Sequence, residues 1–132
     1  MKILFVMPKV GSWATHGIHK SPNQLYAHWA SFVRQRGYKD VAVIDGRAHE
    51  TPMEQLIEQV KAKNPDIVVM GEQIHGYAGY GVLRHFKEAA LKIKQVLPKT
   101  KIILGGLWFS AMPVPTLEEN PAVDFVVMGE EE

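Results

Sequence analysis

Five short apolar segments recur along the chain, separated by stretches in which polar and apolar residues mix. They are Lys2–Met7, Val41–Ile44, Ile67–Met70, Lys101–Leu104 and Asp124–Met128. Their apolar residues follow one another directly, without the polar–apolar alternation of a strand that has one wet face. Continuous runs of this kind indicate strands covered on both faces, as in parallel sheets. The pattern therefore predicts five buried parallel strands.

Apolar residues recur at helical spacing between these segments. The three stripes are Leu25, Trp29, Phe32 and Val33; Met53, Leu56, Ile57 and Val60; and Val82, Phe86, Ala89, Ala90, Ile93 and Leu97. Such spacing places the apolar side chains of each segment on one side of a helix. A weaker helical pattern covers Thr116–Glu119. The chain therefore alternates strand and helix four times and closes on a fifth strand.

Local signals predict where these helices begin and end. Ser21-Pro22 opens the first helix, and Gly37 closes it. Thr51–Glu54 has the spacing of a capping box ahead of the second helix, which Asn64-Pro65 ends. Pro98 ends the third.

Alternating strands and helices predict a doubly wound α/β domain, Rossmann-like or flavodoxin-like, with a five-stranded parallel sheet. We expect the strand order 2-1-3-4-5, which short domains of this type favour. The 132 residues suit one domain. The fifth strand has no helix after it to cover it, so we expect a covering element further along a longer chain.

Composition narrows the function. The net charge is +1 and lysine and arginine form no cluster, so nothing favours a nucleic-acid partner. Cysteine is absent, which excludes disulfides, thiolate zinc sites and iron–sulfur ligation within these residues. The apolar run at the N-terminus is too short for a signal peptide or a membrane span, so a cytoplasmic protein is the default expectation.

The loops after the strands share an unusual abundance of glycine. In doubly wound sheets, ligands bind outside the carboxyl ends of the strands, where the strand order reverses. Ten of the eleven glycines fall in those loops: Gly11, Gly17, Gly46, Gly71, Gly76, Gly79, Gly81, Gly105, Gly106 and Gly129. Because glycine allows a ligand to approach the backbone closely, this edge is the predicted binding site.

Several familiar sites are missing from this edge. The first strand is followed neither by G-x-G-x-x-G nor by G-x-x-x-x-G-K-[ST], so a dinucleotide site and an NTPase are not supported. The clustered carboxylates of a phosphoacceptor receiver are absent as well. Residues 11–17 loosely resemble a flavodoxin-type loop, so a flavin-binding site stays an alternative interpretation. His16 and His19 could face one metal ion but lack a third ligand.

The ordered set of segments resembles the N-terminal cobalamin-binding domains of radical S-adenosylmethionine (SAM) enzymes. The similarity spans the chain: MKILFV at the start, VAVID at 41–45, NPDIVVMG at 64–71, and ILGGLWFSAMP followed by TLEENPAVDFVVMGEEE. The layout is similar to the group that includes the anaerobic magnesium-protoporphyrin monomethyl ester cyclase and the class B methyltransferases. The resemblance implies that residues 1–132 form a cobalamin-binding domain and that a radical SAM domain follows.

The resemblance also implies a ligand site. Gly105-Gly106 would let the nucleotide tail of cobalamin run beside the sheet, with Leu107 and Trp108 near the tail or the corrin ring. Residues 71–74 would line the other side of the tail. The full set of expected cofactor contacts is Gly11, Ser12, Trp13, His16, Gly17, Asp45, Gly71, Glu72, Gln73, Ile74, His75, Gly105, Gly106, Leu107, Trp108 and Gly129.

The sequence departs from that of many cobalamin-binding proteins at the motif that ligates cobalt. Corrinoid methyltransferases and mutases carry D-x-H-x-x-G after the first strand, and its histidine ligates cobalt from below. The segment 8–21 has no aspartate, so that motif is absent and the expected state is base-off, without a histidine ligand. His16, His19 or Gln73 would be the candidates if a protein ligand exists.

The resemblance implies that the chemistry belongs to cofactors. The downstream domain would bind a [4Fe-4S] cluster through C-x-x-x-C-x-x-C and cleave SAM, and the parent would methylate or cyclise at an unactivated carbon, whereas residues 1–132 alone would not catalyse. Two alternatives stay open: a free-standing flavodoxin-like domain that binds a flavin or other nucleotide, and a noncatalytic interaction domain.

Overall fold

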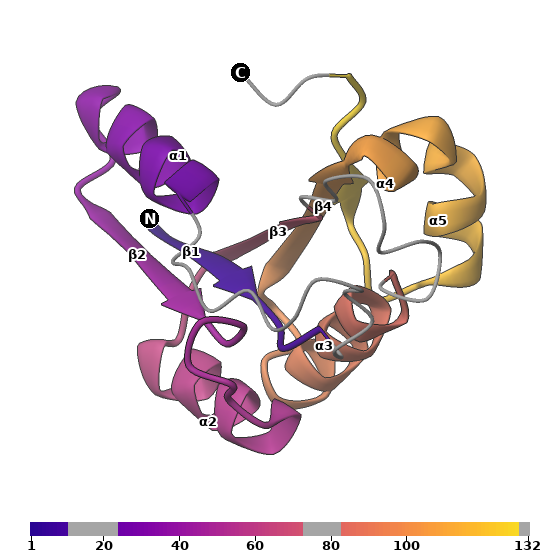
Figure 1. Ribbon diagram of the computed structural model, residues 1–132, viewed down its shortest axis with the longest axis horizontal. Coiled ribbons are helices and arrows are strands. Elements are labelled where there is room, and N and C mark those ends of the chain that lie inside the picture. Colours follow the sequence, from indigo (N-terminus) through magenta and orange to yellow (C-terminus); the bar gives the residue numbers. More distant parts are fainter. Residues whose placement is uncertain (11–23, 73–82, 130–132) are drawn as a thin grey trace.

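The computed structural model describes residues 1–10, 24–72 and 83–129 (Figure 1). Strands and helices alternate along the chain. The elements are β1 (Lys2–Met7), α1 (Gln24–Gln35), β2 (Asp40–Asp45), α2 (Met53–Lys63), β3 (Ile67–Glu72), α3 (Leu83–Val96), β4 (Lys101–Gly106), α4 (Leu107–Ala111), α5 (Pro113–Glu119) and β5 (Phe125–Val126). No helix in the described ranges has both the length and the apolar character needed to cross a membrane.

The five strands form one parallel sheet in the order β2-β1-β3-β4-β5. The predicted fold class and strand order are therefore confirmed. The order reverses between β1 and β3, because the chain leaves β1 toward β2 and leaves β3 toward β4. The carboxyl ends of β1 and β3 thus flank the crevice in which such sheets bind ligands.

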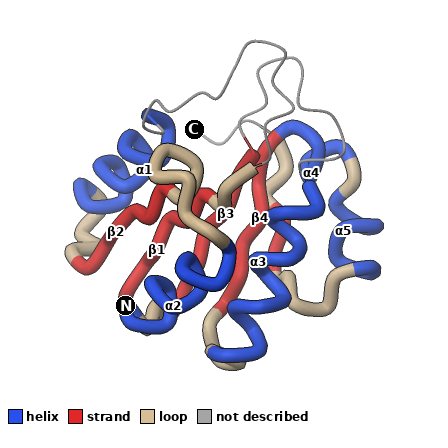
Figure 2. The backbone as a smooth tube through the Cα atoms, turned by 60° about the horizontal axis from the view of Figure 1, so that its bottom comes forward, coloured by secondary structure: helices blue, strands red, loops and turns tan. Residues whose placement is uncertain are grey.

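Helices cover the two faces of the sheet unequally. Helices α2 and α3 lie on one face, and α1 lies behind the β2 end of the other (Figure 2). Helices α4 and α5 continue beside α3, with Phe86 of α3 edge-on to Phe109 of α4 at 6.0 Å and Lys87 of α3 paired with Glu119 of α5 at 3.7 Å.

The face under α2 and α3 is a closed core, but the other face is partly open. Side chains of β3 and β4 that point toward α2 and α3, such as Val68 and Leu104, are fully buried. On the α1 side, the register aligns Phe5, Val69, Ile103 and Phe125 in one row across four strands. Helix α1 packs on Phe5, whereas Val69 and Ile103 are half-buried and Phe125 is 55% exposed.

The apolar stripe of α1 is rotated from the predicted one. Tyr26, Trp29 and Ala30 are buried, whereas Phe32 is exposed, with the Arg36 guanidinium 4.7 Å from the centre of its ring. The inclusion of Phe32 in the core stripe was therefore wrong. Helix α1 instead turns Tyr26 toward the sheet, where its ring packs on Phe5 and its hydroxyl meets the ends of two strands.

Helix α2 confirms its stripe but not its cap. Leu56, Ile57 and Val60 are buried, and Asn64 ends the helix in the left-handed conformation. The N-cap is Pro52, and no side chain caps the helix, so the predicted capping box is wrong. Thr51, the predicted cap, lies one residue before the observed N-cap, and it is buried.

The third stripe is confirmed, and β2, β3 and β4 are each two residues longer than expected. Phe86, Ala89, Ala90 and Ile93 are buried on α3, while Val82 and the predicted helix start at Ser21-Pro22 lie outside the described residues. Gly71 and Gly105-Gly106, placed in loops by the sequence pattern, belong to β3 and β4: Gly71 pairs with Gly105, and Glu72, the last residue of β3, pairs with Gly106. The fifth strand is shorter than predicted, at Phe125–Val126.

Candidate functional site

The carboxyl ends of β3 and β4 form a wall of bare backbone. Gly71 pairs with Gly105 and Glu72 with Gly106 in the parallel register, and all three glycines are buried. Three of the four positions at this end of the ladder therefore carry no side chain. A ligand at this edge would meet peptide groups of two neighbouring strands directly.

Gly106 also sets the direction in which the chain leaves the sheet. Its φ is +105°, a conformation that side-chain-bearing residues rarely adopt, and it is the N-cap of α4. Helix α4 begins at the next residue, so Leu107 sits directly on the rim of the glycine wall. Leu107 is 71% exposed, whereas Trp108 is half-buried and packs against the core. Leu107 is therefore the better-placed apolar contact for a ligand, and Trp108 mainly supports α4.

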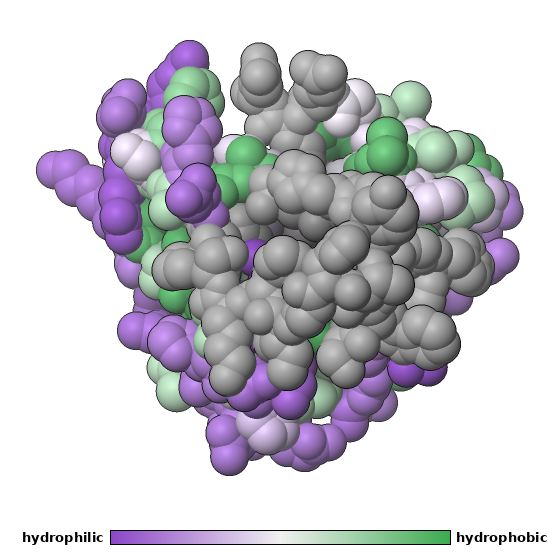
Figure 3. All heavy atoms as spheres, in the orientation of Figure 1, coloured by the Kyte–Doolittle hydropathy of each residue, from purple (hydrophilic) through white to green (hydrophobic). Residues whose placement is uncertain are grey.

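The segment after β5 is fastened to α4 by a serine. The Ser110 hydroxyl accepts a hydrogen bond from the Gly129 N–H at 3.2 Å and lies 3.1 Å from the Val127 carbonyl oxygen, to which it can donate. Met128 between them is exposed. The segment from Val127 to Gly129 is therefore held beside Ser110 of α4, and Figure 3 shows apolar atoms near α4 and beside α1.

Asp45 lies at the same edge but further along the sheet. It ends β2, in register with Met7, and its Oδ1 accepts a hydrogen bond from the Ala48 N–H at 2.9 Å. The carboxylate therefore holds the turn after β2. Because β1 and β3 lie between β2 and β4, the structure does not bring Asp45 together with Gly105 and Gly106.

Of the predicted contact residues, the structure groups Gly71, Glu72, Gly105, Gly106, Leu107 and Gly129 at one end of β3, β4 and α4. Those that lie outside the described residues are Gly11, Ser12, Trp13, His16, Gly17, Gln73, Ile74 and His75. Within the described ranges, no three histidine, aspartate or glutamate side chains gather as metal ligands.

The sequence analysis missed two residues at this edge, Tyr26 and Met128. Tyr26 could have been found from an alternative helical stripe, Tyr26, Trp29, Ala30 and Val33, which fits the i, i+3, i+4, i+7 spacing as well as the chosen one. Met128 was assigned to the fifth strand, and only the early end of β5 exposes it.

A pocket of about 220 Å³ lies where the start of α2 meets the first half of α3. Its described lining residues are Lys9, Met53, His85 and Glu88. Burial lowers the pKa of His85, the nearby Arg84 lowers it further, and Glu88 opposes both. A neutral imidazole is therefore favoured in this pocket, which is separate from the glycine wall.

The fold is that of a flavodoxin-like α/β domain, with bare backbone in β3 and β4 at the edge where such sheets bind ligands. The model of the B12 binding domain family matches residues 26–132. The chain therefore belongs to the B12-binding domain family.

Relatives of known name agree with this family. The chain is 29% identical to the anaerobic magnesium-protoporphyrin IX monomethyl ester cyclases of Rubrivivax gelatinosus and Cereibacter sphaeroides, covering 100% of this chain and 23% and 21% of those proteins. It is 31% identical to an uncharacterized methyltransferase of Pyrococcus horikoshii, covering 27% of it. The chain thus spans about a quarter of the length of these relatives.

A solved structure shares the fold. A cobalamin-binding protein from Desulfitobacterium hafniense aligns with a TM-score of 0.53 over 96% of this chain and 52% of that one, at 16% sequence identity. At this identity the likeness concerns the fold alone.

Proposed function

We propose that residues 1–132 bind cobalamin as the N-terminal module of a cobalamin-dependent radical SAM enzyme that methylates or cyclises its substrate at an unactivated carbon. The observation that carries the proposal is the glycine wall of Gly71, Gly105 and Gly106 in a chain of the B12-binding family. The similarity of the chain to magnesium-protoporphyrin cyclases and to a methyltransferase supports cyclisation and methylation as the two reaction classes.

The described residues fit the proposed ligand. A nucleotide tail that runs beside the sheet needs peptide groups without intervening side chains, which Gly71, Gly105 and Gly106 provide. A flat macrocycle needs an apolar rim, which the exposed Leu107 and Met128 provide. When bound, cobalamin supplies methyl-transfer or redox chemistry at its cobalt. The domain itself binds and orients that cofactor.

We propose further that cobalamin is held base-off and without a histidine ligand. The support is the absence of an aspartate from residues 8–21, which rules out the D-x-H-x-x-G motif there. Of the three described histidines, His28 is exposed on α1, His49 lies beyond β2 and His85 of α3 lines the separate pocket, so none is part of the glycine wall.

The parent protein would also contain a domain that binds SAM and a [4Fe-4S] cluster, and a segment that covers the open half of the sheet. The row Val69, Ile103 and Phe125 supports a cover, because parallel sheets are normally buried on both faces. If a further segment covers it, Phe125→Ala costs about 2 kcal/mol in the natural protein but less than about 0.5 kcal/mol in residues 1–132 alone. If urea denaturation gave the same loss of stability for Phe125→Ala in both proteins, the proposed covering segment would be contradicted.

The ligand is tested by titrating the purified protein with hydroxocobalamin, followed by gel filtration, reduction and electron paramagnetic resonance. We expect retained corrin and a base-off cob(II)alamin spectrum without nitrogen coupling from the protein. Nitrogen coupling would contradict the absence of a histidine ligand. Tight binding of flavin mononucleotide with no retention of corrin would replace the proposal by the flavodoxin-like alternative.

A further inference from the structure

The ladder between β1 and β3 stops two residue pairs before β1 ends. The register pairs Ile3, Leu4 and Phe5 with Ile67, Val68 and Val69, and goes no further. In a parallel ladder, the next steps would join the Gly71 N–H to the Val6 carbonyl and the Gly71 carbonyl to the N–H of residue 8. Residue 8 is proline, which has no N–H to donate. The proline directly after β1 therefore leaves the carbonyl of Gly71 without its strand partner.

The hydroxyl of Tyr26 takes the place of the missing ladder bonds. It accepts a hydrogen bond from the Gly71 N–H at 2.6 Å and lies 2.8 Å from the Gly71 carbonyl and 3.3 Å from the Val6 carbonyl, to either of which its proton can be donated. One phenol thus closes the gap between the diverging ends of β1 and β3, at the crevice where the strand order reverses.

The phenol is held rigidly in that gap. Tyr26 is 0% exposed, and its ring stacks on Trp29 at 5.2 Å between centroids and packs against Phe5 at 6.1 Å. Because the ring cannot move aside, the hydroxyl keeps Gly71 in line with Gly105 of β4, its partner in the glycine wall. Without the hydroxyl, the peptide groups of Gly71 would be buried without a partner in the sheet and would turn toward water.

We propose that Tyr26 is a positioning residue for the nucleotide end of cobalamin, acting through the Gly71 peptide that its hydroxyl holds. This inference rests on the proposed function. Loss of the hydroxyl should therefore weaken the binding of corrinoids that carry the nucleotide. The binding of corrinoids without the nucleotide should change little, since the corrin ring would rest on the rim formed by Leu107 and Met128.

The test compares Tyr26→Phe with the unsubstituted protein, using the natural chain. Cobalamin and cobinamide, which has the corrin ring but no nucleotide, are titrated by absorbance. We expect Tyr26→Phe to weaken cobalamin binding about tenfold and cobinamide binding by less than about twofold. Hydrogen exchange at the Gly71 amide, measured without ligand, should rise about tenfold.

Thr100→Val is the matched control. Thr100 is also buried, and its hydroxyl donates to the Pro65 carbonyl at 2.7 Å at the opposite edge of the sheet. It should lower stability without changing the ratio of the two affinities. Equal weakening of both corrinoids by Tyr26→Phe, or no weakening of either, would overturn the positioning role. Failure of the unsubstituted protein to bind either corrinoid would overturn the proposed function and this inference together.

Discussion

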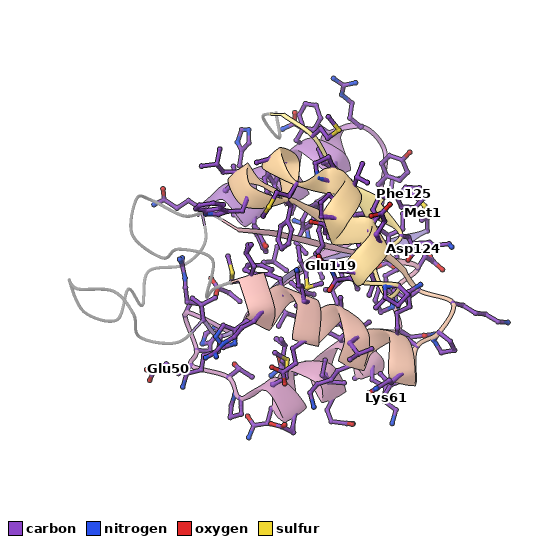
Figure 4. All side chains as sticks on the ribbon, turned by 90° about the vertical axis from the view of Figure 1, so that its right-hand side faces the viewer. Met1, Glu50, Lys61, Glu119, Asp124 and Phe125 are labelled. Atoms are coloured by element: carbon purple, nitrogen blue, oxygen red, sulfur yellow. The ribbon has the colours of Figure 1, made fainter. Side chains whose placement is uncertain are left out.

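The two edges of the sheet differ in the residues that lie there. At the amino edge, each of two carboxylates accepts a hydrogen bond from the backbone of a neighbouring strand: Asp66 from the Lys2 N–H at 2.6 Å and Asp124 from the Ile102 N–H at 2.9 Å. Asp124 also pairs with Lys94 at 2.8 Å and with Lys101 at 2.9 Å. Figure 4 shows Met1 and Asp124 at this end and Glu50 at the other.

At the carboxyl edge, Gly71, Gly105 and Gly106 leave the backbone of β3 and β4 bare, and the side-chain hydrogen bonds described beside these strands involve two neutral hydroxyls, those of Tyr26 and Ser110. Charged side chains join neighbouring strands at the amino edge, whereas a neutral hydroxyl joins β1 to β3 at the carboxyl edge. The comparison teaches that the charged groups that join the strands lie away from the edge at which such sheets bind ligands.

The largest effect is expected from Asp124→Asn. Asp124 is only 17% exposed and joins α3, β4 and β5, so the asparagine leaves two lysines without their carboxylate. We expect a loss of about 2–3 kcal/mol of unfolding free energy with little change in corrin affinity. Asp66→Asn is the control, because Asp66 is 65% exposed and should cost less than about 1 kcal/mol. If urea denaturation gave the same loss of unfolding free energy for both variants, the larger role assigned to Asp124 would be contradicted.

The same carboxylate predicts a pH dependence of stability. Burial alone would raise the pKa of Asp124, but hydrogen bonds from Lys94, Lys101 and the Ile102 N–H, with the charge of Lys94, lower it to about 2. A depressed native pKa stabilises above the unfolded value near 4 and loses that contribution as the pH falls toward 2. We expect a loss of about 2 kcal/mol over that window, measured by urea denaturation. A slope in Asp124→Asn as steep as in the unsubstituted protein would assign the loss to other groups.

A smaller effect on stability, but a selective one on binding, is expected from Gly106→Ala. Its matched control is Gly37→Ala, since Gly37 has a similar φ of +99° and open space around it, between α1 and β2. Each variant should lose about 1 kcal/mol from backbone strain, but only Gly106→Ala should weaken cobalamin binding, by about tenfold. The measurement is thermal unfolding together with corrin titration. Equal affinities in the two variants would remove Gly106 from the site.

The smallest effect is expected from Leu107→Ala. Both Leu107 and Leu91, which lies on α3 away from the edge, are exposed, so neither substitution should change stability by more than about 0.5 kcal/mol. Loss of apolar contact at the rim should weaken corrin binding about threefold in Leu107→Ala and not in Leu91→Ala. The two affinities are compared by titration, and indistinguishable values would place the corrin ring elsewhere.

The sequence predicted the architecture well because its signals are local. Continuous apolar runs and helical stripes are properties of five to fifteen neighbouring residues, and they indicated the parallel sheet, its covering helices and the glycine-rich edge. The strand order followed from the small size of the domain. The Gly105-Gly106 pair could be read as part of the site for the same reason, since adjacent glycines are visible without any partner.

What the sequence could not show depends on residues that are distant along the chain. Tyr26 meets carbonyls 20 and 45 positions away, and the lengths of β3 and β4 were decided by their pairing with each other. The spacing of apolar residues does not distinguish a stripe through Phe32 from one through Tyr26, and the contacts of Tyr26 with the sheet decide between them. The chain by itself determined which segments are strands and helices and where backbone is left bare. Tertiary structure decided which side chains complete the sheet, because a hydrogen bond exists only once both of its partners are in place.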